Sequence, residues 1–297
     1  MQRFSATITL CLLLAFSHSS LAGEKSIVDD LNIIPPMPTK EDKRHWKGLW
    51  PALTDDAVSR GYDLPLPFGI SASYLSLERS VEVKSVKAGF NGNLNNVTRR
   101  VSVDTQNEVQ SGILKLDTFI LPFLNVYAFG GKIDNQSAVD LSVTYPWFGG
   151  DRTYETRLFP DLQADLWGAG ISLSGGYKNF FTTLDVTYSS TDFGGAFSER
   201  IEAFIYSSRI GYRGSIGKYT TSIFAGAAYW DTESVIKGSI PIGGNNLDFE
   251  VLQGPSNPWN AMVGAAIDFS DRWQCHGQFD FNFDDMTMLV IGTTFRF

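Results

Sequence analysis

Ten stretches of this chain alternate between apolar and polar residues, and this period of two constrains the fold more than any other feature. In 180–189, for example, Phe180, Leu184 and Val186 alternate with Thr183 and Asp185. Successive side chains of a strand point to opposite faces, so each stretch predicts a strand with one apolar and one polar face. The predicted strands are 68–78, 111–120, 125–134, 166–174, 180–189, 204–212, 219–231, 259–269, 273–283 and 286–297.

The lengths of these strands suit a membrane better than a soluble core. A tilted strand that crosses a bilayer needs about 9–11 residues. Several apolar faces begin or end with an aromatic residue, as Trp259 and Phe269 do, which is typical of the aromatic girdles of membrane barrels. Beyond the first two dozen residues the sequence has no run of about 20 apolar residues, so no membrane-spanning helix is expected. The alternative is a soluble lipocalin-like protein or a β-sandwich, whose strands also alternate between apolar and polar residues.

The connections between the strands alternate in length. Those at 122–124, 175–179, 213–218 and 270–272 are short, whereas 79–110, 135–165 and 232–258 are long and polar. Short turns on one rim and long loops on the other are typical of a closed, antiparallel, up-and-down transmembrane β-barrel, an all-β fold. We expect about ten strands. Eight or twelve stay open as alternatives, because 81–88 and 139–145 are also strand-like.

The segments before the barrel differ from it in composition. Arg3, the apolar run 8–16 and a small-x-small site at 20–22 predict a cleaved signal peptide over 1–22. Residues 23–67 are polar and carry helix signals, with Trp46, Leu49 and Trp50 on one helical face. We expect 23–67 to be a periplasmic or plugging segment with short helices, and 68–297 to be the barrel.

Charge and cysteine content exclude some partners. Loss of Arg3 with the signal peptide leaves 23 basic and 32 acidic residues, a net charge of −9, which disfavours nucleic acid as a partner. Cys11 leaves with the signal peptide, so Cys275 has no partner for a disulfide.

The last strand carries the one resemblance to a known group of proteins. It reads Leu-Val-Ile-Gly-Thr-Thr-Phe-Arg-Phe over 289–297, with Phe295 and the terminal Phe297 on one face. This resembles the C-terminal signature of Gram-negative outer-membrane β-barrel proteins. Within that class, the chain resembles an uncharacterised family of small barrels. The resemblance implies a location in the cell outer membrane, contact with its lipid and lipopolysaccharide, and assembly by the barrel-assembly machinery through this strand.

The polar faces of the predicted strands carry charged residues that should meet inside the barrel. Ionisable groups in a narrow lumen need opposite charges or water, so we expect a polar network that largely fills the lumen. Stabilising ion pairs or a lining that selects a small solute would both explain it, and the near balance of charges indicates no ion preference. The network is predicted to contain Lys115, Asp117, Lys132, Asp185, Arg209, Asp268, His276, Asp280 and Arg296.

The sequence gives little sign of catalysis. Omptin-type proteases use an Asp-x-His pair, but Lys43 and Gln274 stand two residues before the histidines of the mature chain, His45 and His276. Outer-membrane lipid hydrolases need a histidine and a serine at the lipid face, whereas His276 is on a polar face. One cysteine and two histidines cannot supply a usual zinc site, and we expect no cofactor or metal.

Three functions follow from the sequence, in order of preference. The first is a non-enzymatic outer-membrane barrel with a structural or surface-interaction role. The second is a narrow channel or transporter for a small solute that the sequence does not identify. The third is an outer-membrane hydrolase with an atypical site, in which a change of His276 would abolish turnover.

Overall fold

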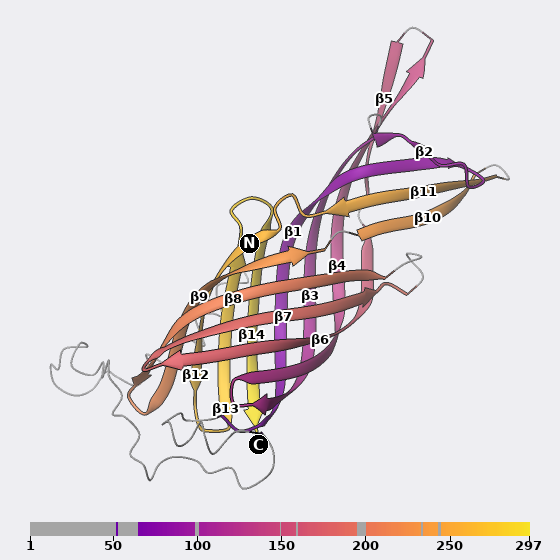
Figure 1. The fold of residues 1–297 in the computed structure, drawn as a ribbon. Coiled ribbons are helices and arrows are strands. Elements are labelled where there is room, and N and C mark those ends of the chain that lie inside the picture. The colour runs from indigo at the N-terminus through magenta and orange to yellow at the C-terminus, as the bar shows by residue number, and fades with distance from the viewer. Residues whose placement is uncertain are drawn as a thin grey trace.

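The computed structural model describes residues 52, 65–98, 101–148, 150–158, 160–194, 200–232, 234–242 and 245–297, and every element in them is a β-strand (Figure 1). These residues contain no helix that is long and apolar enough to cross a membrane. The expected signal peptide and the expected helix with Trp46, Leu49 and Trp50 lie outside the described residues.

Ten antiparallel strands form a closed barrel, which confirms the predicted fold and strand number. Each strand pairs with the next along the chain, and β14 pairs with β1 from Arg296 opposite Gly69 to Met286 opposite Arg79. The barrel strands are β1 (Phe68–Phe90), β3 (Val101–Leu121), β4 (Leu124–Trp147), β6 (Asp161–Tyr177), β7 (Phe180–Asp192), β8 (Ile201–Ile216), β9 (Tyr219–Asp231), β12 (Trp259–Asp268), β13 (Trp273–Phe281) and β14 (Met286–Arg296).

The two rims differ as the sequence predicts. The short turns after β3, β6, β8 and β12 lie on the rim where β14 ends, at the C-terminus in Figure 1. The expected long connections, however, are built largely of strand. The strand-like stretches 81–88 and 139–145 extend β1 and β4, and further strands fill the remainder of these connections. These are β2 (Asn95–Asn96), β5 (Gly150–Leu158), β10 (Ser234–Ile242) and β11 (Asn245–Gly254).

One side of the barrel wall therefore continues past the long-loop rim. β1 pairs with β14 up to Arg79 and then with β11 from Glu82 to Phe90. β4 likewise changes its partner from β6 to β5 at about Val139. The result is an extension sheet with two parts that no longer pair with each other beyond Glu82, namely β10-β11-β1 with β2, and β3-β4-β5 (Figure 1).

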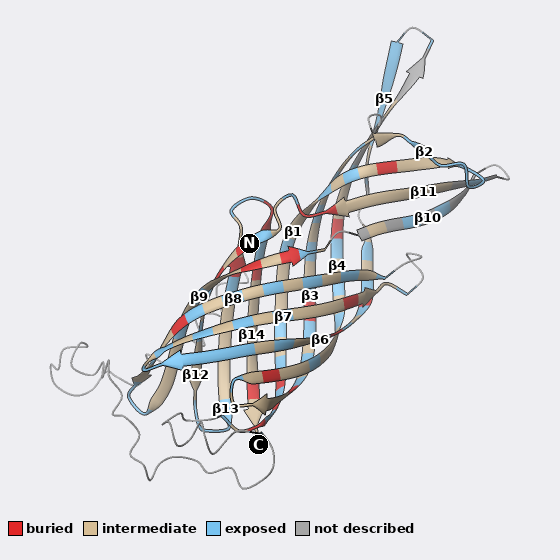
Figure 2. Ribbon diagram, in the orientation of Figure 1, coloured by how far each residue is buried: buried red, intermediate tan, exposed pale blue. Residues whose placement is uncertain are grey.

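The outer face of the barrel is apolar, and its inner face toward the short turns is polar. Along β3, Leu114 and Leu116 point outward and are 66% and 61% exposed, whereas Ser111 and Asp117 point inward and are 3% and 6% exposed. Figure 2 shows a similar alternation of exposed and less exposed residues along much of β6, β7 and β8. A soluble β-sheet protein buries its apolar face, so this arrangement is suited to lipid.

Aromatic residues form a belt on the outer face toward the long-loop rim. Their rings follow one another across β6, β7, β8, β9 and β12, with neighbouring centroids 5.1–6.5 Å apart. Such rings are enriched at membrane interfaces. The members of this outer belt are Trp167, Tyr188, Phe204, Tyr206, Tyr229 and Trp259.

A second belt lies at the short-turn rim. Ring contacts pair Phe180 with Tyr212 and Tyr219 with Phe269. On β13, β14 and β1 the contacts continue through Trp273, Phe295, Phe297 and Phe68. Eight residues separate the belts on β7 and ten on β12. At about 3.4 Å per residue and a tilt of about 40°, these separations span roughly 20–26 Å, close to the hydrophobic band of outer-membrane barrels.

The accessibility of Cys275 tests this orientation. Cys275 has the parity of Trp273 and Phe279 on β13 and therefore lies on the outer face between the belts. In isolated membranes we expect it to react with an uncharged, lipid-soluble maleimide and to resist a sulfonated one. Asn95→Cys in a Cys275→Ser background is the control, because exposed β2 should admit both reagents. Equal labelling of Cys275 by both reagents would contradict its contact with lipid.

Candidate functional site: the lumen of the barrel

An ion pair lies in the lumen near the short-turn rim. The Asp117 carboxylate, 1% exposed, lies 3.0 Å from the Arg296 guanidinium and accepts a 2.9 Å hydrogen bond from Asn125. Arg296 also donates to the carbonyl of Leu66 at 3.2 Å. Gly69 makes room for this ion pair, because a Cβ atom there would stand 2.3 Å from Asp117 Oδ1.

A hydroxyl cluster surrounds the next carboxylate up the lumen. Asp185 on β7 accepts hydrogen bonds from the Tyr127 hydroxyl at 2.9 Å and from Thr187 at 2.8 Å. Ser172 on β6 donates a third. These bonds join β4, β6 and β7 through the interior. Asp185 therefore has its hydrogen-bond capacity taken largely by neutral groups.

Aromatic rings in the middle of the lumen lie against glycines of the wall. A Cβ atom on Gly170 would meet Tyr127 Oη at 2.3 Å, and one on Gly264 would meet Phe224 Cζ at 2.3 Å. Phe129 stands over Gly168 and Phe181 over Gly211 in the same way. Because these glycines lack side chains, the four rings occupy the wall rather than the axis of the lumen.

Two cations stand on two of these rings. Lys115 Nζ lies 5.1 Å from the centroid of the Tyr127 ring, and the Arg209 guanidinium carbon lies 5.4 Å from that of Phe224. In both cases the glycine is in the barrel wall, the ring lies on the glycine, and the cation lies on the ring toward the lumen. Among the described residues neither cationic group forms a hydrogen bond or an ion pair, and Arg209 Nε is buried.

His276 and Asp280 complete the polar faces of β13. Gly292 lies between Ser73 and His276 in the sheet and leaves room for both side chains. A Cβ atom at Gly292 would lie 2.8 Å from His276 Nε2 and 2.4 Å from Ser73 Oγ. Asp280, which is 2% exposed, accepts a 2.7 Å hydrogen bond from Gln278. His276 points into the lumen, where a lipid substrate at the outer face would not meet it.

The lumen between these polar groups and the long loops is apolar, which the sequence pattern did not predict. Met262, Met286 and Met288 are each at most 6% exposed and pack with Trp230 and Ala228. Around them lie Leu75, Leu77, Ile205 and Val290. The expectation of a lumen filled by polar side chains therefore describes the half near the short turns, whereas apolar side chains close the half near the long loops.

Polar groups tie the loops over this apolar cluster. Arg79 stacks on Trp230, with 5.3 Å between the guanidinium carbon and the ring centroid. Asp285 in the β13–β14 turn accepts hydrogen bonds from Ser256, through its backbone N–H at 3.1 Å and its hydroxyl at 2.5 Å, and from Asn282. Burial alone would raise the pKa of Asp285, but these hydrogen bonds and the charge of Arg79 lower it below the ordinary value. Asp285 thus tethers the connection before β12 at the mouth.

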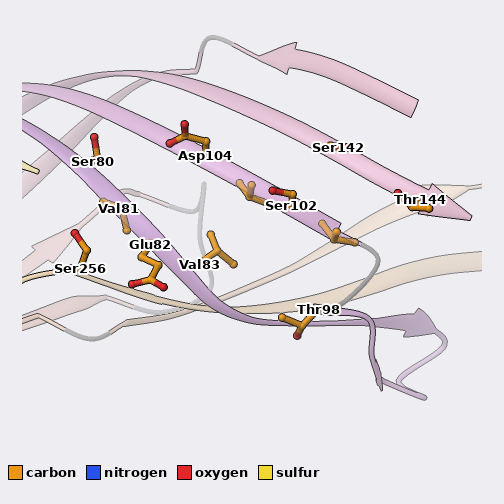
Figure 3. Close-up of a pocket in the computed structure, with 12 residues that line it drawn as sticks. Ser80, Val81, Glu82, Val83, Thr98, Ser102, Asp104, Ser142, Thr144 and Ser256 are labelled. Atoms are coloured by element: carbon orange, nitrogen blue, oxygen red, sulfur yellow. The ribbon is translucent and has the colours of Figure 1, made fainter. Parts of the chain in front are cut away.

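A pocket of about 510 Å³ opens where β1 and β3 separate (Figure 3). The two strands pair as far as Glu82 opposite Asp104, and beyond this point β1 follows β11. The lining combines hydroxyl groups, valines and two carboxylates. It comprises 80–83 of β1, 101–104 of β3, Thr98, Ser142, Thr144 and Ser256.

The structure separates the predicted lumen residues into groups. Lys115 and Arg209 stand at mid-lumen and Asp117 pairs with Arg296, while Asp268 binds Arg213 and Gln274 at the short-turn rim. Lys132 is a correction, because it lies on the outer face of β4 and pairs with Asp165, both well exposed. Its position is even, whereas Tyr127 and Phe129 show that the odd positions of β4 face inward. No group of three or more His, Cys, Asp and Glu side chains within the described residues could hold a metal ion.

The closed barrel, its apolar outer face and its two aromatic belts define a β-barrel of the Gram-negative outer-membrane class. No family model and no curated protein matches the chain. Among solved structures it is similar to the outer membrane protein OprG of Pseudomonas aeruginosa, at 13% identity and a TM-score of 0.42, over 79% of this chain and 98% of OprG.

Two further solved structures are similar to the chain at lower TM-scores. The toluene transporter TbuX of Ralstonia pickettii is 9% identical, with a TM-score of 0.33, over 79% of this chain and 90% of TbuX. The translocator domain of the autotransporter NalP of Neisseria meningitidis is 11% identical, with a TM-score of 0.32, over 82% of this chain and 93% of that domain. Identities and TM-scores this low carry no conclusion about the function of this chain.

The ring-on-glycine contacts can be tested by their stability. Gly170→Ala places a Cβ atom 2.4 Å from Tyr127 Cζ and 2.7 Å from the Val186 carbonyl oxygen, so we expect a loss of about 1–3 kcal/mol in the free energy of unfolding. Gly175→Ala on the same strand meets nothing within 4 Å and should change it by no more than about 0.5 kcal/mol. Urea unfolding in detergent micelles measures both. Equal effects would show that the ring contact is unimportant.

The tether at Asp285 predicts a pH dependence. Because its folded pKa is depressed, Asp285 stabilises the mouth fully above the usual carboxyl pKa of about 3.9, and this contribution is lost as the pH falls through the folded pKa. Carboxyl NMR should give a depressed pKa in the wild type, and Ser256→Ala should raise it. Ser270→Ala on the opposite rim should leave it unchanged. An ordinary pKa in the wild-type protein would refute the tether.

Proposed function

We propose that this protein is a narrow, gated channel for a small solute in the Gram-negative outer membrane. The observation that carries the proposal is that four inward aromatic rings lie against wall glycines instead of crossing the lumen. A barrel filled only for stability would gain more from side chains that meet at its axis. This lining therefore favours a lumen that lets a solute pass over one that is packed only for stability.

The apolar cluster at the long-loop end serves as the gate. Hydrophobic constrictions close pores by excluding water, and they reopen when their side chains move. Methionine is unbranched and adapts its shape readily, and three of the five core residues of the cluster are methionines. Arg79 on Trp230 and the Asp285 tether cover this gate from outside.

The ends of the barrel support the remaining parts of the proposal. Phe297 and Phe68 exchange backbone hydrogen bonds of 3.0 and 3.2 Å, so the last residue completes the wall. This position suits a recognition element for the barrel-assembly machinery, formed by Phe295 and Phe297. Ala52 donates a 3.1 Å hydrogen bond to the carbonyl of Ile120, beside a short turn, which supports a place for the segment 23–67 at the periplasmic mouth.

A surface-interaction role is the second candidate. The extension sheet carries β1, β3 and β4 beyond the aromatic belt and forms the pocket between β1 and β3. A barrel that only conducts has no evident need for this sheet. Removal of the β10–β11 hairpin separates the candidates, since conductance should persist while binding of a surface ligand should be lost.

Conductance in planar bilayers tests the gate. Met262→Ala with Met288→Ala removes two buried side chains at the constriction, and we expect at least a several-fold rise in ion conductance over a low wild-type value. Leu289→Ala, next to Met288 but on the outer face, is the matched control and should conduct like the wild type.

The same experiment can defeat the proposal. Heat-modifiable gel mobility first establishes that each variant forms a closed barrel. If the folded double variant conducts ions no better than the wild type, the lumen is blocked by its side chains, and the structural role is the better description.

A further inference from the structure

The structure assigns an anion-binding site to the middle of the lumen, formed by Lys115 and Arg209, that takes a small organic carboxylate with an apolar body. This inference deepens the proposed channel function by naming the class of solute. The near balance of charges in the sequence indicated no ion preference, because the number of charges does not show which of them are paired.

The lumen carboxylates are satisfied by other partners. Asp117 binds Arg296 and Asn125, and Asp185 accepts bonds from three hydroxyl groups. Asp268 binds Arg213 and Gln274 at the rim. Asp280 accepts a hydrogen bond from Gln278. None of these groups forms an ion pair with Lys115 or Arg209 within the described residues.

Lys115 and Arg209 face one space from different walls. Lys115 is on β3 and Arg209 on β8, with β4, β6 and β7 between them in one direction around the barrel. Each cation stands on a ring that lies against the wall, so each is directed toward the axis. His276 on β13 also faces the lumen, where it lies over Gly292. The carboxylates of Asp117 and Asp185 act on the charge of Lys115 but form no ion pair with it among the described residues, so its ammonium donors stay available to a bound anion.

The surroundings of Arg209 indicate what else the anion carries. In the sheet register Arg209 is opposite Gly226, and Gly226 is opposite Met262 of the apolar cluster. Since Gly226 has no side chain, nothing on that strand position separates the guanidinium from the methionine. A ligand whose carboxylate binds Arg209 and Lys115 can thus place an apolar body against Met262 and its neighbours. Arginine suits a carboxylate because its planar donors match the two oxygens.

Binding of benzoate to the full-length protein in detergent tests the assignment by calorimetry. We expect benzoate to bind at least ten-fold more tightly than benzyl alcohol, which has the same ring and no charge. Arg209→Gln and Lys115→Gln should each weaken benzoate binding at least ten-fold. Arg209→Lys, which keeps the charge, should lose less than Arg209→Gln.

Lys132→Gln on the outer face is the matched control and should bind benzoate like the wild type. Equal binding of benzoate and benzyl alcohol, or benzoate binding that survives both glutamine substitutions in folded protein, overturns the assignment. The readout is independent of conductance. A barrel that binds benzoate but stays closed refutes only the channel, and one that conducts without this binding refutes only the anion site.

Discussion

The closure of β14 onto β1 is the constraint on which the rest of this structure depends. Lipid offers no hydrogen-bond partners, so a sheet can cross a membrane only if its two edges pair with each other. Here that pairing runs from Gly69 and Arg296 to Arg79 and Met286. Closure divides every strand into an outer and an inner face, so within the membrane band polar side chains must fit inside a narrow lumen.

The lumen solves this problem in two ways along its length. Near the short turns, carboxylates are held by arginine, amide and hydroxyl groups, as Asp117 and Asp185 show. Near the long loops, methionines and Trp230 exclude water. Between them, rings laid on glycines support Lys115 and Arg209, which form no ion pair within the described residues. The interior thus changes from polar to apolar along the barrel, and this change is the basis of the proposed gate.

The sequence predicted the barrel because a period of two is a local property that every strand displays. It also predicted the short-turn rim. It could not predict partners across the lumen, since nothing in the alternation says that Tyr127 reaches Asp185 or that Arg79 stacks on Trp230. Lys132 was misplaced because polar residues occupy both faces of β4 above the membrane band, where alternation no longer reports burial. The apolar cluster was missed because methionines at inward positions resemble lipid-facing ones.

The partner exchange of β1, from β14 to β11, has a consequence for how this protein can vary in evolution. Between the belts an inserted residue would turn a whole strand inside out, because the side-chain period is two. Above the outer belt, water can satisfy unpaired edges such as that of β10, so strands there can lengthen, shorten or acquire new hairpins at little cost. The same continuous strand thus belongs to a part whose length is fixed by the bilayer and to a part that selection can reshape freely.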